Sequence, residues 1–426
     1  MSDRGSKRLA LFGGRPVRTK KFPAYNTIGK EERRAVGRVF SSGIFSRYLG
    51  AWHSHFYGGP EVRALEREWA SFFKVKHAIA VNSASTGLQC AMGAIGIRRG
   101  DEVIVTPLSM SISATAPLFY GGTPIFADVE PDFFCLDPSS VRQRISKKTK
   151  AIIAVYLFGQ PCDFTALRGI AKKHNLYLIE DAAQAPCARF GSKYAGTLGD
   201  IGIYSLNYHK HIHTGEGGIL VTNDDRLARR LQLIRNHAEA VVSGEPMFRH
   251  DADLIGSNYR MTECTAAIAR AQLKKLPALV SERVRNCSYL AKRLSRLPGI
   301  APAPTRSGST HAYYLQPFLF NEDVVGVPRG RFLEAVRAEL SVIARRENEG
   351  VRVTGGYVRP LYLLPLFANM RKSSYRKGAC MVAERLHERE LFTHEYMHAS
   401  ATRDDLDDVI AAFTKVYEHR RELLRT

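Results

Sequence analysis

The segments AIIAVYLF (151–158), LYLIED (176–181) and IGIYSL (201–206) are short, apolar and rich in β-branched and aromatic residues. Near-continuous apolar runs of this length are typical of strands that are buried on both faces. A helical pattern, FTALRGIAKKH (164–174), lies between the first two runs. Strands that alternate with helices in this way predict a largely parallel sheet with helices covering both faces.

The same alternation extends in both directions along the chain. Further β-rich runs and helical patterns are HAIAV (77–81), TGLQCAMGAIG (86–96), EVIVT (102–106), PIFADV (124–129), PSSVRQRIS (138–146) and GILVT (218–222). After about residue 262 follow a long helical stretch, a Pro-rich break, an expected strand at AYYLQPFLF (312–320) and more helices. The predicted fold class is α/β, with a mostly parallel central sheet in a large domain and a smaller C-terminal α+β domain.

We expect three parts in the chain: a basic N-terminal arm (residues 1–30), the large α/β domain (31–270) and the small C-terminal domain (271–426). The 426 residues are 45% hydrophobic and 24% charged, which excludes a disordered, collagen-like or coiled-coil protein. The seven cysteines form no CxxC pair and predict neither a disulfide framework nor a zinc site. Because a secretory signal and a membrane-spanning run are both missing from the sequence, we expect a cytoplasmic protein.

Charge is the unusual feature of the composition. The chain has 62 Lys and Arg against 41 Asp and Glu, a net charge of +21. Eleven of these cations lie in the first 40 residues. A solvated basic surface explains this excess, and so does attraction to an anionic substrate. The sequence has no helix-turn-helix or RNA-binding signature, so a nucleic acid partner is not expected.

Polar residues follow the predicted strands, at the sheet edge where ligands of such folds gather. NSAST (82–86) opens a helix and could bind phosphate, or Ser83 or Ser85 could simply cap that helix. EDAAQA (180–185) ends a buried strand, where Asp181 would either pair with a cationic ring nitrogen or cap the next turn. Gln184 offers an amide three residues later.

Lys210 lies just past another strand, in NYHKHIHTGEGG (207–218). A lysine is usually a solvated surface charge, but a desolvated one loses its proton more easily and becomes a nucleophile toward carbonyls. His209, His211 and His213 alternate around it, yet the glycine-rich turn favours a packed loop, and no metal is expected. A fourth motif, GSNYRMTE (256–263), opens the long helix with Thr262 as its expected cap.

A phosphate cradle, an acid for a pyridinium nitrogen and a lysine for an aldehyde match the three functional groups of pyridoxal 5'-phosphate (PLP). The order NSAST…EDAAQA…YSLNYHKHIHTGEGG…RNHA…GSNYRMTE resembles the DegT/DnrJ/EryC1/StrS family of sugar aminotransferases, which are fold-type-I PLP enzymes. The resemblance covers nearly the whole chain, including YVRPLYLLPLF (357–367).

The resemblance implies a role for each candidate residue. Lys210 would form the Schiff base with PLP and later move the substrate proton, and Asp181 would pair with the ring nitrogen. Gln184 would approach the ring hydroxyl, and Asn258 would reach the phosphate bound by a neighbouring subunit, because sites in this family lie at a dimer interface. The residues expected to hold the phosphate are Ser85, Thr86 and Ser205. Met110 stands where the family usually has an aromatic residue stacked on the ring.

The predicted function is transfer of an amino group from an amino acid, glutamate or glutamine, to a keto-sugar that is nucleotide-linked or phosphorylated. We expect a homodimer with shared active sites. An alternative is a PLP enzyme of another class, such as elimination or amino-acid cyclisation, and a more remote one is a non-catalytic cofactor-binding regulator. His311, Tyr313 and Tyr357 are candidates for the acceptor pocket, although packing would explain them equally well.

Overall fold

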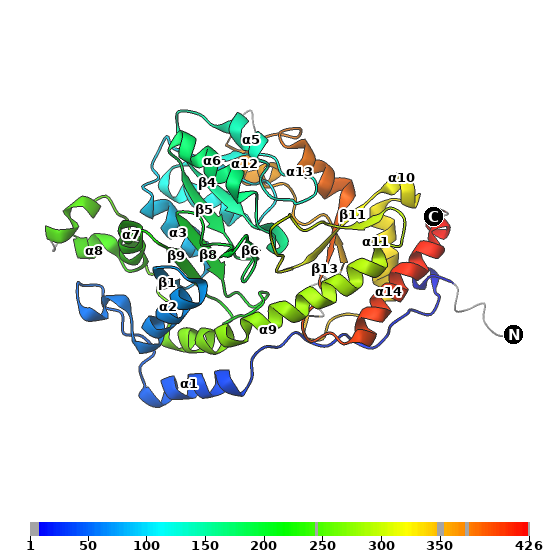
Figure 1. Ribbon diagram of the computed structural model, residues 1–426, viewed down its shortest axis with the longest axis horizontal. Helices are drawn as coiled ribbons and strands as arrows, with labels where there is room; N and C mark the ends of the chain where they lie inside the picture. Colours follow the sequence, from blue (N-terminus) through cyan, green and yellow to red (C-terminus); the bar gives the residue numbers. More distant parts are fainter. Residues whose placement is uncertain (1–7, 243–245, 347–352, 371–374, 425–426) are drawn as a thin grey trace.

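A seven-stranded sheet forms the centre of the computed structural model, which describes residues 8–242, 246–346, 353–370 and 375–424 (Figure 1). Its strand order is β1-β9-β8-β5-β4-β2-β3. The strands are β1 (His77–Val81), β2 (Glu102–Val105), β3 (Thr123–Phe126), β4 (Thr149–Val155), β5 (Tyr177–Asp181), β8 (Ile201–Ser205) and β9 (Gly218–Thr222). Only β9 runs against its neighbours β1 and β8; the other described pairs of this sheet are parallel. The predicted α/β class is confirmed.

Each face of the sheet is buried under helices, because successive strand residues point to opposite sides. Ile152 of β4 joins a core formed with α2 (Pro60–Phe73), α6 (Phe164–His174) and part of α9 (Glu263–Leu294). The next residue, Ile153, joins the opposite core, formed with α3 (Ala84–Ala94) and α7 (Asp225–Arg235). The near-continuous apolar character of the strands therefore reflects burial on both faces.

Short elements connect this framework. They are α1 (Lys30–Ser42), α4 (Ile112–Thr115), α5 (Pro138–Arg144), β6 (Arg189–Phe190), β7 (Lys193–Tyr194) and α8 (Ala238–Val242). Thr262 caps α9 as predicted, since its hydroxyl accepts the backbone N–H of Thr265 at 3.2 Å. In Figure 1, α9 runs below the central sheet towards the C-terminal part of the molecule.

A four-stranded antiparallel sheet, ordered β10-β11-β13-β12, forms the C-terminal part. Its strands and main helices are β10 (Ile300–Pro302), β11 (Gln316–Phe320), α11 (Arg329–Glu339), β12 (Val353–Gly355), β13 (Leu391–His394) and α14 (Arg403–Glu418). The expected strand over 312–320 begins only at Gln316. The reason is that Ala312 and Tyr314 donate their N–H groups to Gly159 and Phe158, which holds this segment against the loop after β4.

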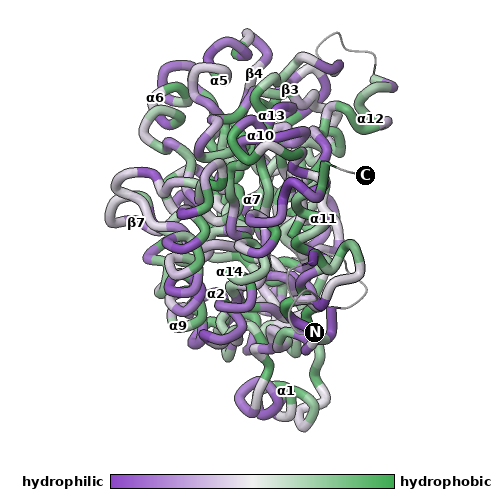
Figure 2. Tube along the Cα trace, turned by 90° about the vertical axis from the view of Figure 1, so that its right-hand side faces the viewer, coloured by the Kyte–Doolittle hydropathy of each residue, from purple (hydrophilic) through white to green (hydrophobic). Residues whose placement is uncertain are grey.

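The N-terminal segment lies along the C-terminal part. Leu9 and Phe22 are buried in its core, and Arg18 forms an ion pair with Asp405 at 2.8 Å. Residues 1–7 of the expected arm lie outside the described residues. Helix α1 projects from the rest of the molecule in both views and carries hydrophilic and hydrophobic residues (Figures 1 and 2). Because α9 crosses the expected border at 270/271, the division into domains stays a prediction.

Within the part of the chain that the structure describes, no helix is both long enough and apolar enough to cross a bilayer.

Candidate active site

A cavity of about 540 Å³ opens where the chain leaves β5 and β8 and enters α3. This is the carboxyl edge of the parallel strands, the usual ligand position in open α/β sheets. Six of the eight predicted site residues line it: Ser85, Met110, Asp181, Gln184, Ser205 and Lys210. Thr86 and Asn258 are not among its lining residues. The opposite wall comes from the C-terminal part of the chain, including Tyr314, Arg346 and Tyr357.

Lys210 is 9% exposed, so it is not the solvated surface charge that a lysine usually is. Burial lowers the pKa of its amine from 10.5 to about 8, and the charge of Asp181 opposes this shift. Its Nζ lies 4.1 Å from the centre of the Tyr314 ring. Among the described residues, no ion pair joins Lys210 directly to Asp181. The amine therefore releases its proton much closer to physiological pH than a solvated lysine does, although the protonated form still dominates there.

Asp181 ends β5 with its carboxyl group buried in the cavity wall. One oxygen accepts the Ser113 hydroxyl at 3.3 Å, and the other accepts the backbone N–H of Ala183 at 3.1 Å. The bond from Ala183 is the turn cap that the sequence offered as the alternative role for Asp181. Asp181 makes this cap and also lines the cavity. Burial raises the pKa of Asp181, while the two hydrogen bonds and Lys210 lower it.

Glu180, one residue earlier, lies on the other side of the strand. Its carboxylate is fully buried and accepts the backbone N–H of Gly196 at 2.8 Å and that of Leu198 at 2.6 Å. The Tyr156 hydroxyl also donates to it. These donors satisfy the acid within the protein, so Glu180 stabilises a loop whereas Asp181 is available to a ligand.

At the start of α3 the structure separates the two roles predicted for NSAST, helix capping and phosphate binding. Ser83 is the helix cap, since its hydroxyl accepts the Thr86 N–H at 3.1 Å. Ser85 is exposed and lines the cavity. The Thr86 hydroxyl donates to Asn82 at 2.6 Å. Gly218 of β9 packs so close to this turn that a Cβ there would lie 2.5 Å from the backbone of Ser83.

Gln184 is engaged at both ends of its amide. Its oxygen accepts the Phe158 N–H at 2.7 Å, and its nitrogen donates to the Tyr357 hydroxyl at 3.1 Å. Tyr357 thus belongs to the cavity, whereas His311 and Tyr313 stack on each other with ring centres 3.8 Å apart and do not line it. Met110 is 58% exposed at the cavity wall. Its role beside a cofactor ring stays a prediction.

Asn258 is exposed and does not line this cavity, and its side-chain oxygen accepts Arg260 Nε at 2.9 Å. Its expected role toward a neighbouring subunit stays a prediction. Of the three alternating histidines, His209 lines the cavity and His211 is buried with its Nε2 2.8 Å from the Ala312 carbonyl oxygen. In the described ranges no group of three or more His, Cys, Asp and Glu is placed to bind a metal.

Several residues at or beside the cavity were not predicted. Ser113 of α4 does not line the cavity but donates its hydroxyl to Asp181, and the Ser-rich pattern SMSIS after β2 was a usable signal for it. Tyr314, Arg346 and Glu395 come from C-terminal segments that carry no motif. Their positions depend on how the two sheets pack, which spacing along the chain does not reveal.

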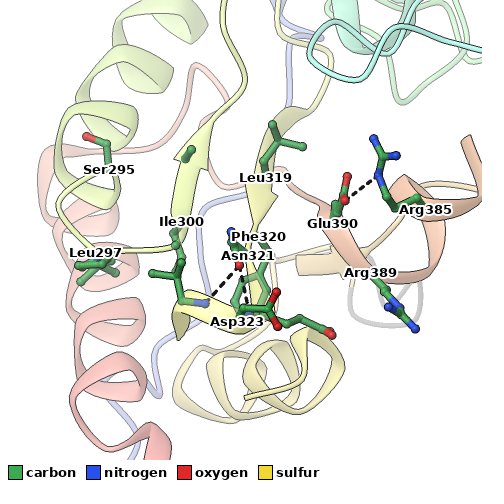
Figure 3. Close-up of a pocket in the computed structure, with 15 residues that line it drawn as sticks. Ser295, Leu297, Ile300, Leu319, Phe320, Asn321, Asp323, Arg385, Arg389 and Glu390 are labelled. Carbon is green, nitrogen blue, oxygen red and sulfur yellow. Dashed lines mark hydrogen bonds and ion pairs between the residues drawn. The ribbon is translucent and has the colours of Figure 1, made fainter. Parts of the chain in front are cut away.

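A second hollow, of about 700 Å³, lies beside β10 at the edge of the C-terminal sheet (Figure 3). Arg385 and Glu390 on one side of it form an ion pair at 2.7 Å, and on the other side Asn321 accepts the backbone N–H groups of Asp323 and Val324. No predicted site residue lines this groove. Its size alone does not make it the active site, because the buried lysine and the buried acid both lie in the other cavity.

A lysine and a carboxylate in one cavity at the edge of a mostly parallel sheet fit a PLP enzyme, and solved structures that resemble this fold are fold-type-I aminotransferases. The chain belongs to the DegT/DnrJ/EryC1/StrS aminotransferase family, whose model matches residues 47–414. It is therefore an enzyme of the aminotransferase family, and the family is PLP-dependent.

Relatives and a solved structure agree with this assignment. The chain is 31% identical to an L-glutamine:2-deoxy-scyllo-inosose aminotransferase of Streptoalloteichus tenebrarius, over 97% of this chain and 99% of the relative. It is 34% identical to a GDP-perosamine synthase of Caulobacter vibrioides, over 84% and 90% of the two chains. The crystal structure of an aminotransferase from Psychrobacter cryohalolentis superposes with a TM-score of 0.80 at 30% identity, covering 93% of this chain and 99% of the other.

Proposed function

We propose that this chain transfers the amino group of glutamate or glutamine to the ketone of a sugar or sugar-like acceptor, with PLP as its cofactor. The observation that carries the proposal is the shared cavity of Lys210 and Asp181. Two ionisable groups of opposite type are buried there without a direct ion pair between them in the described part of the chain. Burial of this kind costs free energy and is characteristic of functional sites.

The chemistry of the donor set fits PLP. Lys210 is the amine for its aldehyde, Asp181 is the carboxylate for its ring nitrogen, and Gln184 lies beside them with its amide nitrogen on Tyr357. Ser85 and Ser205 would hold the phosphate at the N-terminus of α3, where backbone N–H groups favour an anion. Thr86 and Met110 remain proposed members of the same site.

When bound, PLP withdraws electrons from the substrate carbon that carries nitrogen. The protein's own part is then to move protons and to exclude water. Lys210 Nζ, with its pKa lowered to about 8, can hold a proton or release it during the reaction. A cationic ring nitrogen beside Asp181 would favour the charged form of that buried carboxyl group, which Ser113 and Ala183 already hydrogen bond.

The proposed substrates follow the relatives. The name of the S. tenebrarius enzyme includes L-glutamine and 2-deoxy-scyllo-inosose, and that of the C. vibrioides enzyme includes GDP-perosamine. A cyclic ketone, free or nucleotide-linked, is therefore the proposed acceptor here. The net charge of +21 would favour the encounter with an anionic acceptor.

We propose a homodimer in which Asn258 reaches the partner's site. The exposure of Asn258, outside the cavity of its own chain, supports this arrangement. Size-exclusion chromatography with light scattering tests the dimer. A monomer that retains full aminotransferase activity would contradict the shared site.

The decisive experiment is absorbance spectroscopy of the purified protein after incubation with PLP. We expect a visible band from the lysine-bound cofactor, which glutamate or glutamine bleaches and a keto-sugar restores. Lys210→Ala should lose the band and the turnover, whereas Lys172→Ala, an exposed lysine of α6, should keep both. One equivalent of 2-oxo acid per amine transferred distinguishes transamination from elimination or cyclisation, and a bound cofactor without 2-oxo acid would overturn the proposal.

A further inference from the structure

A groove of about 730 Å³ lies at the opposite end of the central sheet from the catalytic cavity. Its lining includes Lys150, near the start of β4, and Tyr177, the first residue of β5. The last residues of these two strands, Val155 and Asp181, line the catalytic cavity instead. A strand rises about 3.3 Å per residue, so the two ends of β5 lie roughly 13 Å apart. Helix α3 likewise begins at the cavity and ends at this amino-edge groove.

The lining of the amino-edge groove has an excess of positive charge. Three of its cations form no ion pair with any described residue: Arg98, Lys150 and Arg226. A fourth cation, Arg230, is buried and already paired with Asp251 at 2.9 Å. Among the described lining residues Asp253 is the single acid, and it lies 3.5 Å from the same Arg230. A ligand with several negative charges would therefore be attracted to this groove.

The other two hollows have the opposite balance of charge. The catalytic cavity is lined by two cations and three acids: Lys210, Arg346, Asp181, Glu216 and Glu395. The hollow beside β10 is also lined by two cations and three acids: Arg385, Arg389, Glu322, Asp323 and Glu390 (Figure 3). Of these three spaces, only the amino-edge groove concentrates the positive charge of the chain where a small molecule would fit.

Aromatic side chains supply the groove with apolar faces and with hydroxyl groups. Phe119 lines it and is 64% exposed. The hydroxyl groups of Tyr120 and Tyr177 have no hydrogen-bond partner in the part of the chain that the structure describes. Helix α3 leaves room for Tyr120 through Gly93, where a Cβ would lie 2.5 Å from the tyrosine oxygen. Aromatic faces bind nucleobases by stacking, and cations beside them bind phosphates.

We propose that the amino-edge groove is a second binding site, for a nucleoside diphosphate. Arg98, Lys150 and Arg226 bind the phosphates, and the base lies against the aromatic side chains. The volume of about 730 Å³ falls within the roughly 300–1,000 Å³ of small-molecule sites. The proposal goes beyond the aminotransferase function, because no residue that lines the catalytic cavity takes part in it.

The test is calorimetric binding of ADP to the PLP-loaded enzyme. Arg98→Gln combined with Lys150→Gln should weaken binding about 10- to 100-fold, because hydrogen bonds from charged groups to the phosphates are lost. Arg99→Gln combined with Lys147→Gln is the matched control. These two cations come from the same connecting segments and are exposed, and their loss lowers the net charge equally, but neither lines the groove. The control should change ADP binding less than about twofold, since exposed charges outside the site are screened by salt.

Phe119→Ser tests the place of the base. It should weaken ADP binding about 5- to 50-fold and leave the binding of pyrophosphate, which has no base, unchanged.

Four results would overturn the proposal. Equal losses in the two double variants would mean attraction to diffuse surface charge. ADP binding that neither double variant changes would place the nucleotide elsewhere, in the catalytic cavity. A wild-type protein that binds no ADP has no such site. If Phe119→Ser converts a dimer to a monomer, the aromatic face is a subunit interface. A wild-type protein that binds ADP in the groove but captures no PLP would instead contradict the proposed function alone.

Discussion

The active-site cavity has two walls of different origin. One wall is built at the carboxyl edge of the central sheet, where Asp181 ends β5, Ser205 ends β8 and Lys210 follows in the next turn. The other wall is built from C-terminal segments, including Tyr314, Arg346 and Tyr357. The first has the acid and the amine that the proposed cofactor requires. The second contains hydroxyl groups and one lining arginine, Arg346, that would contact the substrates.

This difference suggests a division of work between the walls. Groups on the sheet edge are fixed by backbone geometry, because they lie at the end of a buried strand, at the start of a helix or, for Lys210, in the turn that follows β8. Tyr314, Arg346 and Tyr357 on the C-terminal wall are carried by loops, which tolerate changes and usually determine specificity. Changes in the first wall should therefore abolish the chemistry, and changes in the second should alter binding.

After Lys210→Ala, which should remove turnover altogether, the largest effect is expected for Asp181→Asn. The amide has nearly the same shape but no charge, so it cannot stabilise a cationic ring nitrogen. We expect turnover to fall about 100- to 1,000-fold, as when one preorganised electrostatic partner is removed. Steady-state kinetics with saturating PLP measure this loss, and circular dichroism should report an unchanged fold.

Glu180→Gln is the control from the same strand. This carboxylate accepts the N–H groups of Gly196 and Leu198 and does not line the cavity. An amide would lose charge-assisted bonds of about 1.5–3 kcal/mol each. We expect a lower free energy of unfolding in urea with turnover largely retained in the folded protein. The reverse pattern in the two variants would contradict the assignment of Asp181.

Gly218→Ala tests the geometry of the sheet-edge wall. The added Cβ would lie 2.5 Å from the carbonyl carbon of Ser83 and 2.6 Å from the nitrogen of Ala84, so the start of α3 must move. Overpacking of this kind costs about 1–3 kcal/mol. PLP affinity should also fall, about 10- to 100-fold, because the expected phosphate site shifts. Fluorescence titration with PLP measures the affinity.

Gly169→Ala is the matched control, since nothing lies within 4 Å of a Cβ at that helical position. It should be neutral or stabilise the protein by up to about 1 kcal/mol, because alanine favours a helix over glycine. Equal losses of PLP affinity in both variants would show that the contact with Ser83 is unimportant.

The pH dependence of PLP capture tests how the charge of Asp181 affects the pKa of Lys210. Only the neutral amine reacts with an aldehyde, and the pKa of Lys210 is about 8. The capture rate should therefore rise from pH 6 to pH 9 with a midpoint near 8. Asp181 raises the pKa of Lys210, so in Asp181→Asn the midpoint should move to lower pH. Stopped-flow absorbance measures both, and a midpoint near 10 would mean that the lysine is solvated.

The sheet-edge wall could be predicted from the sequence because its residues follow local signals. Asp181 ends an apolar run, Ser83 and Ser85 open a helix, and Lys210 stands between a strand and a glycine-rich turn. Each signal depends on a few neighbouring residues, and the parallel sheet then brings the strand ends together. The sequence could not tell which serine of NSAST caps the helix and which faces the cavity. Ser83 and Ser85 both lie at the start of α3, and they differ in the side of the helix to which each belongs.

The C-terminal wall could not be predicted because its positions depend on long-range packing. Tyr314 belongs to an apparent strand, but the bonds to the loop after β4 hold it out of the sheet. Leu9 and Phe22 also could not be predicted as core residues. They belong to an N-terminal segment rich in cations, yet both are buried in the core of the C-terminal part. Local patterns report how a segment folds, whereas these contacts join segments hundreds of residues apart.

The smallest effect is expected on the C-terminal wall, for Tyr357→Phe. The hydroxyl accepts the Gln184 amide at 3.1 Å, and its loss leaves that buried donor without this partner. A neutral hydrogen bond contributes about 0.5–1.5 kcal/mol, so binding of PLP or of the acceptor should weaken about 2- to 10-fold. Tyr313→Phe is the control, because Tyr313 stacks on His311 and does not line the cavity. A 100-fold loss of turnover in Tyr357→Phe, with PLP affinity unchanged, would place a reacting group on the C-terminal wall and end the division between the two walls.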